Sequence, residues 1–384
     1  MDIRSTSRAV TQLTLGLLPW VPTRGPRRAT DVTAQWLTDK VGSRAPGAVA
    51  LDVEPLDGTT GTTDRRRIGV TWSEAGVDAG LPSSVFIKST PLSAKNRTMV
   101  ASLDMAVNEV NFYRHVGDAL GDLAPKAWFT YAGVGARHLL VLEDLVARGC
   151  RPHALADDCG IDHARSVIEA LAQLHATYWE DPRLGTHFGW ARTWSRRPGH
   201  SVLATFYKRG RKGALALDRP EITPAVRRLA SALDRHADTY YHEFETGPLT
   251  LLHGDSHLGN TYRLPDGRAG LLDWQVVWHG PGLREVSYFL TGGLEPEVRR
   301  PHERELIDLY LDGLRTHGVT DPPTPSEAFD LYRLYAAEAW DATAMTIAWP
   351  GLQAPENMEA SWRRACIAVE DNDVAAAVER TGRR

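Results

Sequence analysis

The chain has 384 residues, of which 42% are hydrophobic and 24% charged, and its formal net charge is −4. This composition is typical of a soluble globular protein and excludes the disordered, the fibrous and the strongly basic nucleic-acid-binding classes. The length favours two domains, or one fold with two lobes. Cys150, Cys159 and Cys366 are too few and too widely spaced for a disulfide framework or a zinc site, so we expect reduced thiols and a cytoplasmic location.

The N-terminal segment contains the longest apolar run near a terminus, residues 15–21, but a membrane span needs about 20 apolar residues. Pro19 breaks the run, three arginines follow it, and the small-residue cleavage site of a secretory signal is missing. We therefore expect residues 1–45 to form an arm that packs on the body, with a helix capped by Asp31 or Thr33.

The pattern of residues 46–145 predicts a β-rich N-terminal lobe. Alternation of apolar and polar residues predicts five strands, at 48–53, 67–72, 84–88, 127–131 and 138–142. Between the third and fourth of them, a helical period indicates a helix over 101–120.

Residues 146–384 predict a mainly helical C-terminal lobe, in which the clearest apolar stripe runs from Asp162 to Trp179. One β segment interrupts the helices, with strands at 249–253, 260–264 and 270–273. A Pro-Asp-Gly turn joins the last two strands. The fold class is therefore α+β with two lobes.

The residues that carry chemistry are concentrated in His253-Gly-Asp-Ser-His-Leu-Gly-Asn260 and Leu271-Leu-Asp-Trp-Gln275. Asp255 follows an apolar strand and lies on a loop, where its carboxylate can accept the proton of an attacking hydroxyl. Asn260 and Asp273 flank two antiparallel strands that bring them close together. One amide and one carboxylate oxygen suit a hard cation such as Mg²⁺. Phosphoryl transfer needs this combination of a base and metal ligands.

This block resembles the catalytic loop and metal-binding motif of the aminoglycoside phosphotransferase and choline kinase superfamily, which has a protein-kinase-like bilobal fold. The Asp-Trp-Gln sequence and the segments 141–145 and 280–290 are most similar to those of ecdysteroid-kinase-like and bacterial aminoglycoside phosphotransferase-family enzymes. The resemblance covers about residues 50–290 in motif order. It implies Asp255 as catalytic base, Asn260 and Asp273 as Mg²⁺ ligands, and ATP, or alternatively GTP, as phosphate donor.

The same resemblance implies nucleotide-binding residues in the first lobe. Lys88, at the end of the third strand, corresponds to the phosphate-binding lysine of the family, and Glu109 to the glutamate that pairs with it. Gly58 and Gly61 lie between the first two strands, where kinases fold a loop over the phosphates. That segment departs from Gly-x-Gly-x-x-Gly, and a plain hairpin turn is the alternative.

The segment from Glu143 to Leu145 is implied to present backbone groups to the adenine edge. Glu285 stands where many relatives have Asp, and we expect it to brace the catalytic loop, a surface helix residue being the alternative. His253 and His257 are separated by a glycine and follow a strand, which disfavours a metal pair. We expect His175 to be a hydrogen-bonded core histidine and Trp274 to pack behind the metal loop.

The acceptor side of the site is less defined. The basic stretch 192–212, with interleaved aromatic residues, indicates either an anionic acceptor or a solvated face. Three tryptophans of the helical tail indicate either core packing or an apolar, ring-stacking acceptor pocket: Trp340, Trp349 and Trp362. Acidic residues that could line a pocket for a polycation are Glu338, Asp341, Glu356 and Glu359.

The prediction is therefore an ATP-dependent kinase that phosphorylates a hydroxyl group of a small-molecule acceptor, without nucleic acid or a membrane span. The alternative is a catalytically silent binding protein of kinase fold, but the base, the metal ligands and the lysine are all present. A protein kinase is disfavoured because no activation segment follows Asp273, and an α/β hydrolase because Gly-x-Ser-x-Gly is absent. The acceptor and the oligomeric state stay open.

Overall fold

The computed structural model describes Thr11, Thr14 and residues 25–60, 63–349, 351 and 353–383. The chain forms two compact units and passes from one to the other three times. The N-unit comprises residues 1–151 and 273–276, and the C-unit comprises residues 152–272 and 277–384. Most of the arm expected before residue 25, and Gly61, lie outside the described residues.

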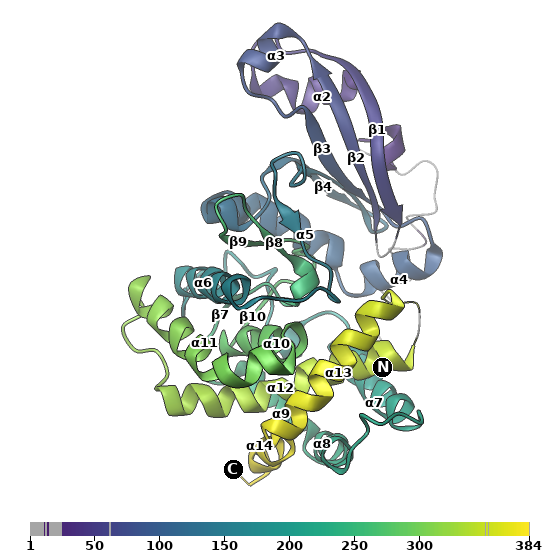
Figure 1. The fold of residues 1–384 in the computed structure, drawn as a ribbon. Coiled ribbons are helices and arrows are strands. Elements are labelled where there is room, and N and C mark those ends of the chain that lie inside the picture. Colours follow the sequence, from purple (N-terminus) through teal and green to yellow (C-terminus); the bar gives the residue numbers. More distant parts are fainter. Residues whose placement is uncertain are drawn as a thin grey trace. The chain divides into compact units, whose positions relative to one another are not determined.

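The N-unit is built on a five-stranded antiparallel sheet in the order β1-β2-β3-β5-β4 (Figure 1). Its strands are β1 (Ala50–Thr60), β2 (Asp64–Trp72), β3 (Ser84–Ser89), β4 (Ala127–Gly133) and β5 (Arg137–Glu143). All five predicted strands are present. The β1–β2 hairpin is longer than expected, because the ladder continues through the Gly/Thr-rich segment as far as the pair Thr60 and Asp64.

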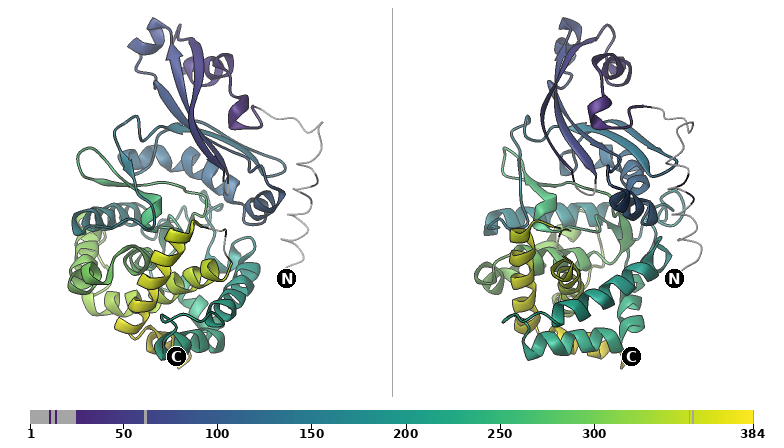
Figure 2. Two further views of the ribbon diagram at one scale, coloured as in Figure 1. Left: turned by 45° about the vertical axis from the view of Figure 1, so that its right-hand side comes forward. Right: turned by 90° about the vertical axis from the view of Figure 1, so that its right-hand side faces the viewer.

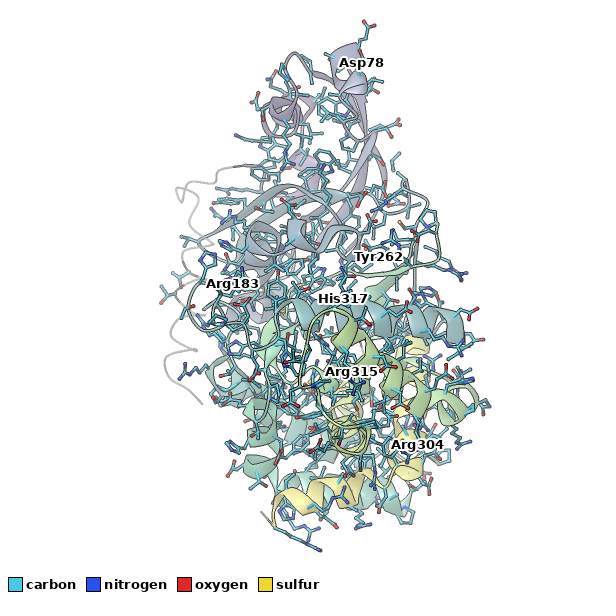
Figure 3. The ribbon with its side chains drawn as sticks, turned by 90° about the vertical axis from the view of Figure 1, so that its left-hand side faces the viewer. Asp78, Arg183, Tyr262, Arg304, Arg315 and His317 are labelled. Atoms are coloured by element: carbon cyan, nitrogen blue, oxygen red, sulfur yellow. The ribbon has the colours of Figure 1, made fainter. Side chains whose placement is uncertain are left out.

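One face of this sheet is covered by the helix α2 (Ala34–Lys40). Thr33 caps it as predicted, its hydroxyl accepting the Trp36 N–H at 3.2 Å. Leu37 packs in a buried cluster with Val85 and Ile87 of β3. Because side chains alternate along a strand, this packing directs the neighbouring Lys88 to the opposite face. A short helix, α3 (Glu74–Asp78), follows β2, and Asp78 points into solvent at its end (Figure 3).

The prediction of a single helix over residues 101–120 is wrong. The segment forms α4 (Ala94–Ser102), α5 (Met105–His115) and the 3₁₀ segment η3 (Gly117–Leu123). Asp104 separates the first two with φ 53, a left-handed conformation that Asp tolerates better than most residues. Apolar residues continue across this break, so their period does not reveal it.

The C-unit is mainly helical, with α12 packed against α7, α10, α13 and α14 (Figure 2). Its helices are α6 (Ile161–Thr177), α7 (His200–Leu215), α8 (Pro224–Arg235), α9 (Ala237–His242), α10 (Leu283–Gly293), α11 (Pro296–Thr316), α12 (Pro325–Ala348), α13 (Pro355–Asp371) and α14 (Val374–Thr381). A side chain at Gly210 would come 2.7 Å from the Met345 backbone, so this glycine permits the close packing of α7 on α12. Among the described residues, no helix combines the length and apolarity of a membrane span.

The β segment of the C-unit forms two small antiparallel pairs. The strands β8 (Thr261–Arg263) and β9 (Ala269–Leu271) flank the Pro-Asp-Gly turn as predicted, and β6 (Arg151–Pro152) extends this sheet. The strand β7 (Thr250–Leu252) pairs instead with β10 (Trp278–Gly280). The strand β10 was not predicted, because three residues are too few to show an alternating pattern. The confirmed fold is α+β, with a β-rich N-terminal and a helical C-terminal part.

The N-terminus of α12 provides a test of local helix stability. Thr324 and Glu327 form a capping box, in which the Thr324 hydroxyl accepts the Glu327 N–H and the Glu327 carboxylate accepts the Thr324 N–H at 2.9 Å. We expect Thr324→Ala to lower the free energy of unfolding by about 1 kcal/mol in a urea titration. The matched control is Ser326→Ala on the same exposed turn, with a change below about 0.5 kcal/mol. Equal effects of the two variants would contradict the capping role.

Candidate active site

Two carboxylate side chains of the N-unit converge on the ammonium group of Lys88. Its Nζ lies 2.8 Å and 2.9 Å from the two carboxylate oxygens of Glu109 on α5, and 2.6 Å from Oδ1 of Asp273. Lys88 is only 3% exposed. The ion pair that the sequence predicts between Lys88 and Glu109 is thus present, and Asp273 completes it.

The electrostatics of this cluster are those of a buried charge network. Burial raises the pKa of Glu109 from 4.5 to about 7, against the opposing effect of Lys88, and the charge of Asp273 raises it further. Burial and the charge of Lys88 lower the pKa of the nearby His138 to about 4, so that this histidine is neutral. Lys88 therefore supplies the positive charge beside the two carboxylates.

The segment 273–276 is held in the N-unit by packing. Asp273 has φ 69, a left-handed conformation that persists in a non-glycine residue only where the surroundings stabilise it. The next residue, Trp274, is fully buried and stacks on Phe112 of α5 with ring centroids 3.9 Å apart and an interplanar angle of 7°. Val276 packs against a cluster that includes Met105. Trp274 thus packs beside the predicted metal ligand, and on the helix that carries Glu109.

The C-unit carries the loop with Asp255, which His253 orients. The Asp255 N–H donates to His253 Nδ1 at 3.2 Å, and His253 Nε2 lies 2.9 Å from the carbonyl oxygen of Leu272. These two bonds require a neutral imidazole with its proton on Nε2. Gly254 has φ 90, which permits the sharp turn before Asp255.

Three polar groups surround the Asp255 carboxylate. The Tyr288 hydroxyl donates to Oδ1 at 3.2 Å, and the Asn260 amide donates to Oδ2 at 3.3 Å. His257 Nε2 lies 3.6 Å from Oδ2. The Asp255 side chain is 33% exposed. A carboxylate that is oriented by donors and partly open can accept a proton from a hydroxyl group that approaches it.

The side chain of Asn260 is fixed through its nitrogen. Nδ2 donates to the Asp255 carbonyl at 2.8 Å, and the Asn260 carbonyl accepts the Leu272 N–H at 2.9 Å. Among the described residues, Oδ1 has no hydrogen-bond partner, so this oxygen is available to a ligand. The described residues contain no group of three His, Cys, Asp or Glu side chains that could hold a metal. Oxygen donors such as Asn260 Oδ1 and the Asp273 carboxylate are of the type that Mg²⁺ prefers.

Glu285 braces the catalytic loop from α10. Its Oε2 accepts the His253 N–H at 2.8 Å, and its Oε1 accepts the Gly254 N–H at 2.7 Å. His175, which is a hydrogen-bonded core residue as predicted, contacts Glu285 at 3.1 Å and the Tyr310 hydroxyl at 2.9 Å. Burial opposes ionisation of Glu285, but the hydrogen bond and charge of His175, together with the charge of Arg284, lower its pKa to about 2.

Two residues that contact the loop, Arg284 and Tyr288, were not predicted from the sequence. Arg284 NH1 donates to the Gly254 carbonyl at 3.0 Å, and NH2 donates to Glu338 at 2.7 Å. Tyr288, which donates to Asp255, follows one helical turn later. Both belong to the segment 280–290 that carries the family resemblance, and their i, i+4 spacing places them on one face of α10, with Glu285 three residues before Tyr288. That spacing was the available signal.

The other predicted nucleotide contacts lie within the N-unit. Gly58 belongs to β1 and pairs with Arg66, while Gly61 lies outside the described residues. The Glu143 N–H donates to the Lys126 carbonyl, and the Leu145 carbonyl accepts the Cys150 N–H, each at 2.8 Å. Their roles in nucleotide binding stay predictions.

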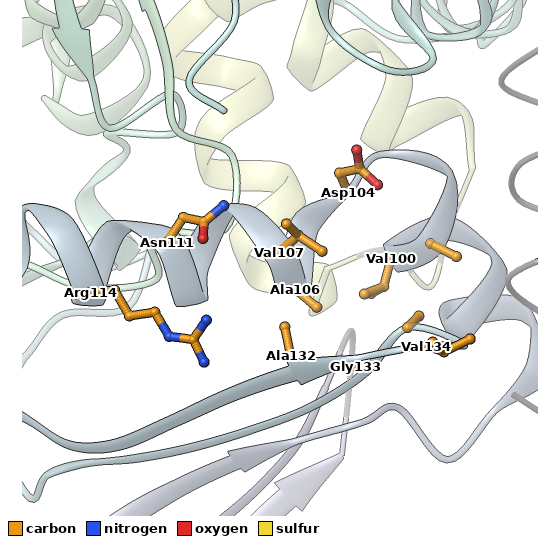
Figure 4. A pocket seen from close by; sticks show the side chains of 11 residues that line it. Val100, Asp104, Ala106, Val107, Asn111, Arg114, Ala132, Gly133 and Val134 are labelled. Carbon is orange, nitrogen blue, oxygen red and sulfur yellow. The ribbon is translucent and has the colours of Figure 1, made fainter. Parts of the chain in front are cut away.

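A cavity of about 380 Å³ lies elsewhere in the N-unit, where side chains of α4 and α5 face the β4–β5 hairpin (Figure 4). It is lined mainly by small apolar residues, including Ala106, Val107 and Ala132, with Arg114 at one end. None of the predicted site residues lines it.

The β-rich N-unit, the helical C-unit and the order Lys88, Glu109, Asp255, Asn260, Asp273 define the protein-kinase-like class shared by aminoglycoside phosphotransferases and choline kinases. The chain matches the family model of the ecdysteroid kinase-like family over residues 67–318. It belongs to that family, which confirms the resemblance inferred from the sequence. No match is found among the curated proteins.

The chain is similar to several solved structures at low sequence identity. Choline kinase LicA from Streptococcus pneumoniae is 13% identical, with 87% of this chain and 98% of that chain covered and a TM-score of 0.45. Spectinomycin phosphotransferase APH(9)-Ia, in complex with ADP and spectinomycin, is 13% identical, with coverages of 92% and 99% and a TM-score of 0.45. A choline/ethanolamine kinase family protein from Mesorhizobium loti is 14% identical, with coverages of 98% and 99% and a TM-score of 0.46.

The depressed pKa of Glu285 predicts a pH-dependent contribution to stability. Since its pKa falls from 4.5 to about 2 on folding, the contribution is present above pH 4.5 and is lost as the pH falls toward 2. It amounts to roughly 3 kcal/mol. In urea titrations, we expect wild type to exceed Glu285→Gln in free energy of unfolding at pH 7, and this difference to shrink below pH 4.5.

The control for this prediction is Glu370→Gln at an exposed position near the end of α13, which should follow wild type throughout. A difference between wild type and Glu285→Gln that stays constant from pH 7 to pH 3 would show that the Glu285 carboxylate is not ionised by its contacts.

Proposed function

We propose that this protein is an ATP-dependent phosphotransferase that transfers the γ-phosphoryl group to a hydroxyl group of a small molecule. The observation that carries the proposal is the buried Lys88 ammonium, held between Glu109 and Asp273. A lysine that serves only stability does not need two buried carboxylates beside it, since burying three charges is costly. A lysine that receives phosphate oxygens needs such fixed partners.

The C-unit supplies the base for this reaction. Asp255, oriented by Tyr288 and Asn260, accepts the proton of the acceptor hydroxyl. The hydroxyl oxygen then bonds to the γ-phosphorus as the bond to the β–γ bridging oxygen breaks, and ADP leaves with that oxygen. Glu285 and Arg284 keep the loop in place, so Asp255 needs no rearrangement during the reaction.

Lys88 supplies the positive charge for the nucleotide phosphates, and Glu109 fixes its position. Mg²⁺, held by the side-chain oxygens of Asn260 and Asp273, would neutralise charge on the phosphate oxygens. Gly58, Glu143 and Leu145 are proposed to contact the nucleotide through the backbone. GTP is an alternative donor.

A cytoplasmic location is part of the same proposal, because ATP is plentiful there. The described cysteines Cys150, Cys159 and Cys366 are all free and buried, as suits a reducing compartment.

The nucleotide site can be tested by thermal unfolding with and without Mg²⁺·ATP. A ligand at a hundred times its Kd stabilises a protein by about 2.7 kcal/mol, which gives a measurable rise in Tm. We expect this rise in wild type and not in Asp273→Asn, which removes the charge but keeps a residue tolerant of the left-handed backbone. Asp78→Asn, on the exposed end of α3, should behave like wild type. No rise for wild type with ATP or GTP would contradict the nucleotide site.

The catalytic base can be tested separately by ADP release with the best acceptor from a screen of alcohols. We expect Asp255→Ala to lower kcat by at least about 10²-fold, because a general base contributes that much or more. The Mg²⁺·ATP-dependent rise in Tm should persist in this variant. Asp321→Ala, in an exposed loop of the C-unit, is the control. Near-wild-type turnover of Asp255→Ala would remove Asp255 from the mechanism.

A further inference from the structure

We infer that the acceptor is a hydroxy acid, whose carboxylate binds to Arg197 while its hydroxyl group faces Asp255. This inference rests on the proposed function and names the class of its second substrate. It concerns the basic stretch 192–212, for which the sequence left two interpretations open.

The structure separates the basic residues of that stretch into different environments. Four of them are exposed and form a solvated face: Arg196, Lys208, Arg209 and Lys212. Arg211 is 3% exposed and is neutralised by Asp341 at 2.6 Å and Asp234 at 2.7 Å. Arg197 belongs to neither group, because it is half-buried and its guanidinium has no carboxylate partner among the described residues.

Aromatic rings hold the Arg197 guanidinium instead of an acid. It lies 5.4 Å from the ring centroid of Trp194 and 5.3 Å from that of Trp278. Trp194 is in turn stacked on Tyr241, with centroids 5.0 Å apart and an interplanar angle of 18°. Cation–π contacts position a guanidinium but leave its N–H donors free. Arg197 is therefore a fixed cation whose donors can bind a planar anion such as a carboxylate.

Arg197 is connected to the catalytic loop through Trp278. The guanidinium of Arg284 lies 5.6 Å from the same ring and donates to the carbonyl of Gly254, the residue before Asp255. Burial lowers the pKa of Arg197 to about 10, and the charges that partly offset it include Glu338 and Asp255. The uncompensated cation is thus within electrostatic range of the proposed base.

Three of the four acidic residues that could attract a cationic acceptor are already paired, and the fourth, Glu356, is exposed. Glu338 pairs with Arg284, and Asp341 pairs with Arg211, in both cases among buried side chains. Glu359 pairs with Arg219. An amino alcohol or a polycation would therefore meet Arg197 with Glu338 and Asp341 already paired, whereas a hydroxy acid would complete the charge pairing.

The test uses sets of acceptors that share a hydroxyl-bearing carbon skeleton and carry an anionic, a neutral or a cationic group at its other end. One set is 4-(hydroxymethyl)benzoate, its neutral amide and 4-(aminomethyl)benzyl alcohol, and another is 3-hydroxybutyrate, its amide and 4-amino-2-butanol. Binding is measured as the rise in Tm in the presence of Mg²⁺·ADP, and turnover as ADP release with Mg²⁺·ATP. We expect the acid of at least one set to reach half-saturation at a concentration roughly tenfold or more below that of its amide, since the hydrogen bonds are charge-assisted.

Arg197→Gln should abolish the preference for acid over amide, and Arg197→Lys should retain part of it. Arg196→Gln, which removes the exposed neighbour, should keep the full preference. The comparison of acceptors on wild type does not depend on the folding of any variant. Acids that bind no better than their amides in every set, or amines that bind best, would overturn the inference. A preference that survives Arg197→Gln would overturn the assignment to Arg197.

Failure of the inference is distinguishable from failure of the proposed function. If wild type shows the Mg²⁺·ATP-dependent rise in Tm and phosphorylates neutral or cationic alcohols without preferring acids, it is a kinase and the hydroxy-acid assignment is wrong. If it shows no rise in Tm with any nucleotide, the proposed function itself fails.

Discussion

The ammonium group of Lys88 is the point on which the N-unit depends. Through Glu109 and Asp273, this group links strand β3 to helix α5 and to a segment 185 residues further along the chain. These charges have little contact with water, so each is stabilised mainly by the others, and loss of one leaves its partners buried and unbalanced. The same arrangement holds α5 against the sheet while leaving a positive charge beside the Asp273 carboxylate. Stability and chemistry therefore share one set of contacts.

In the C-unit, one buried carboxylate fixes the backbone before Asp255. Glu285 accepts two consecutive backbone N–H groups, from His253 and Gly254, and thereby determines the direction in which the chain leaves β7. Arg284 binds the Gly254 carbonyl from the same helix. The backbone of His253 and Gly254, just before Asp255, is thus held by hydrogen bonds to side chains of α10, while the Asp255 side chain stays partly open. A rigid loop with an accessible carboxylate is the arrangement expected of a preorganised base.

The sequence predicted those features that have a local cause. The strand at 84–88 was found because one face of it is buried, and Asp255 and Asn260 because their spacing is short and specific. The break at Asp104 was missed, because a single left-handed residue does not disturb the apolar period around it. Tertiary contacts were the least accessible: nothing near Arg197 in sequence indicates that the ring of Trp278, 81 positions later, supports its guanidinium. A sequence shows which residues are charged, but it does not show which of these charges are already paired with an opposite charge.

The four residues 273–276 have a consequence for how the protein can be divided. They are encoded within the C-unit but belong to the N-unit, where Trp274 fills the place beside Phe112. A fragment that ends at residue 151 would lack this ring and the second carboxylate on Lys88, however well its sheet formed. Gene fragments, fusions or circular permutants cut at that boundary would therefore yield an N-unit with an unfilled core position. The two units have separate cores, but they are not separable modules.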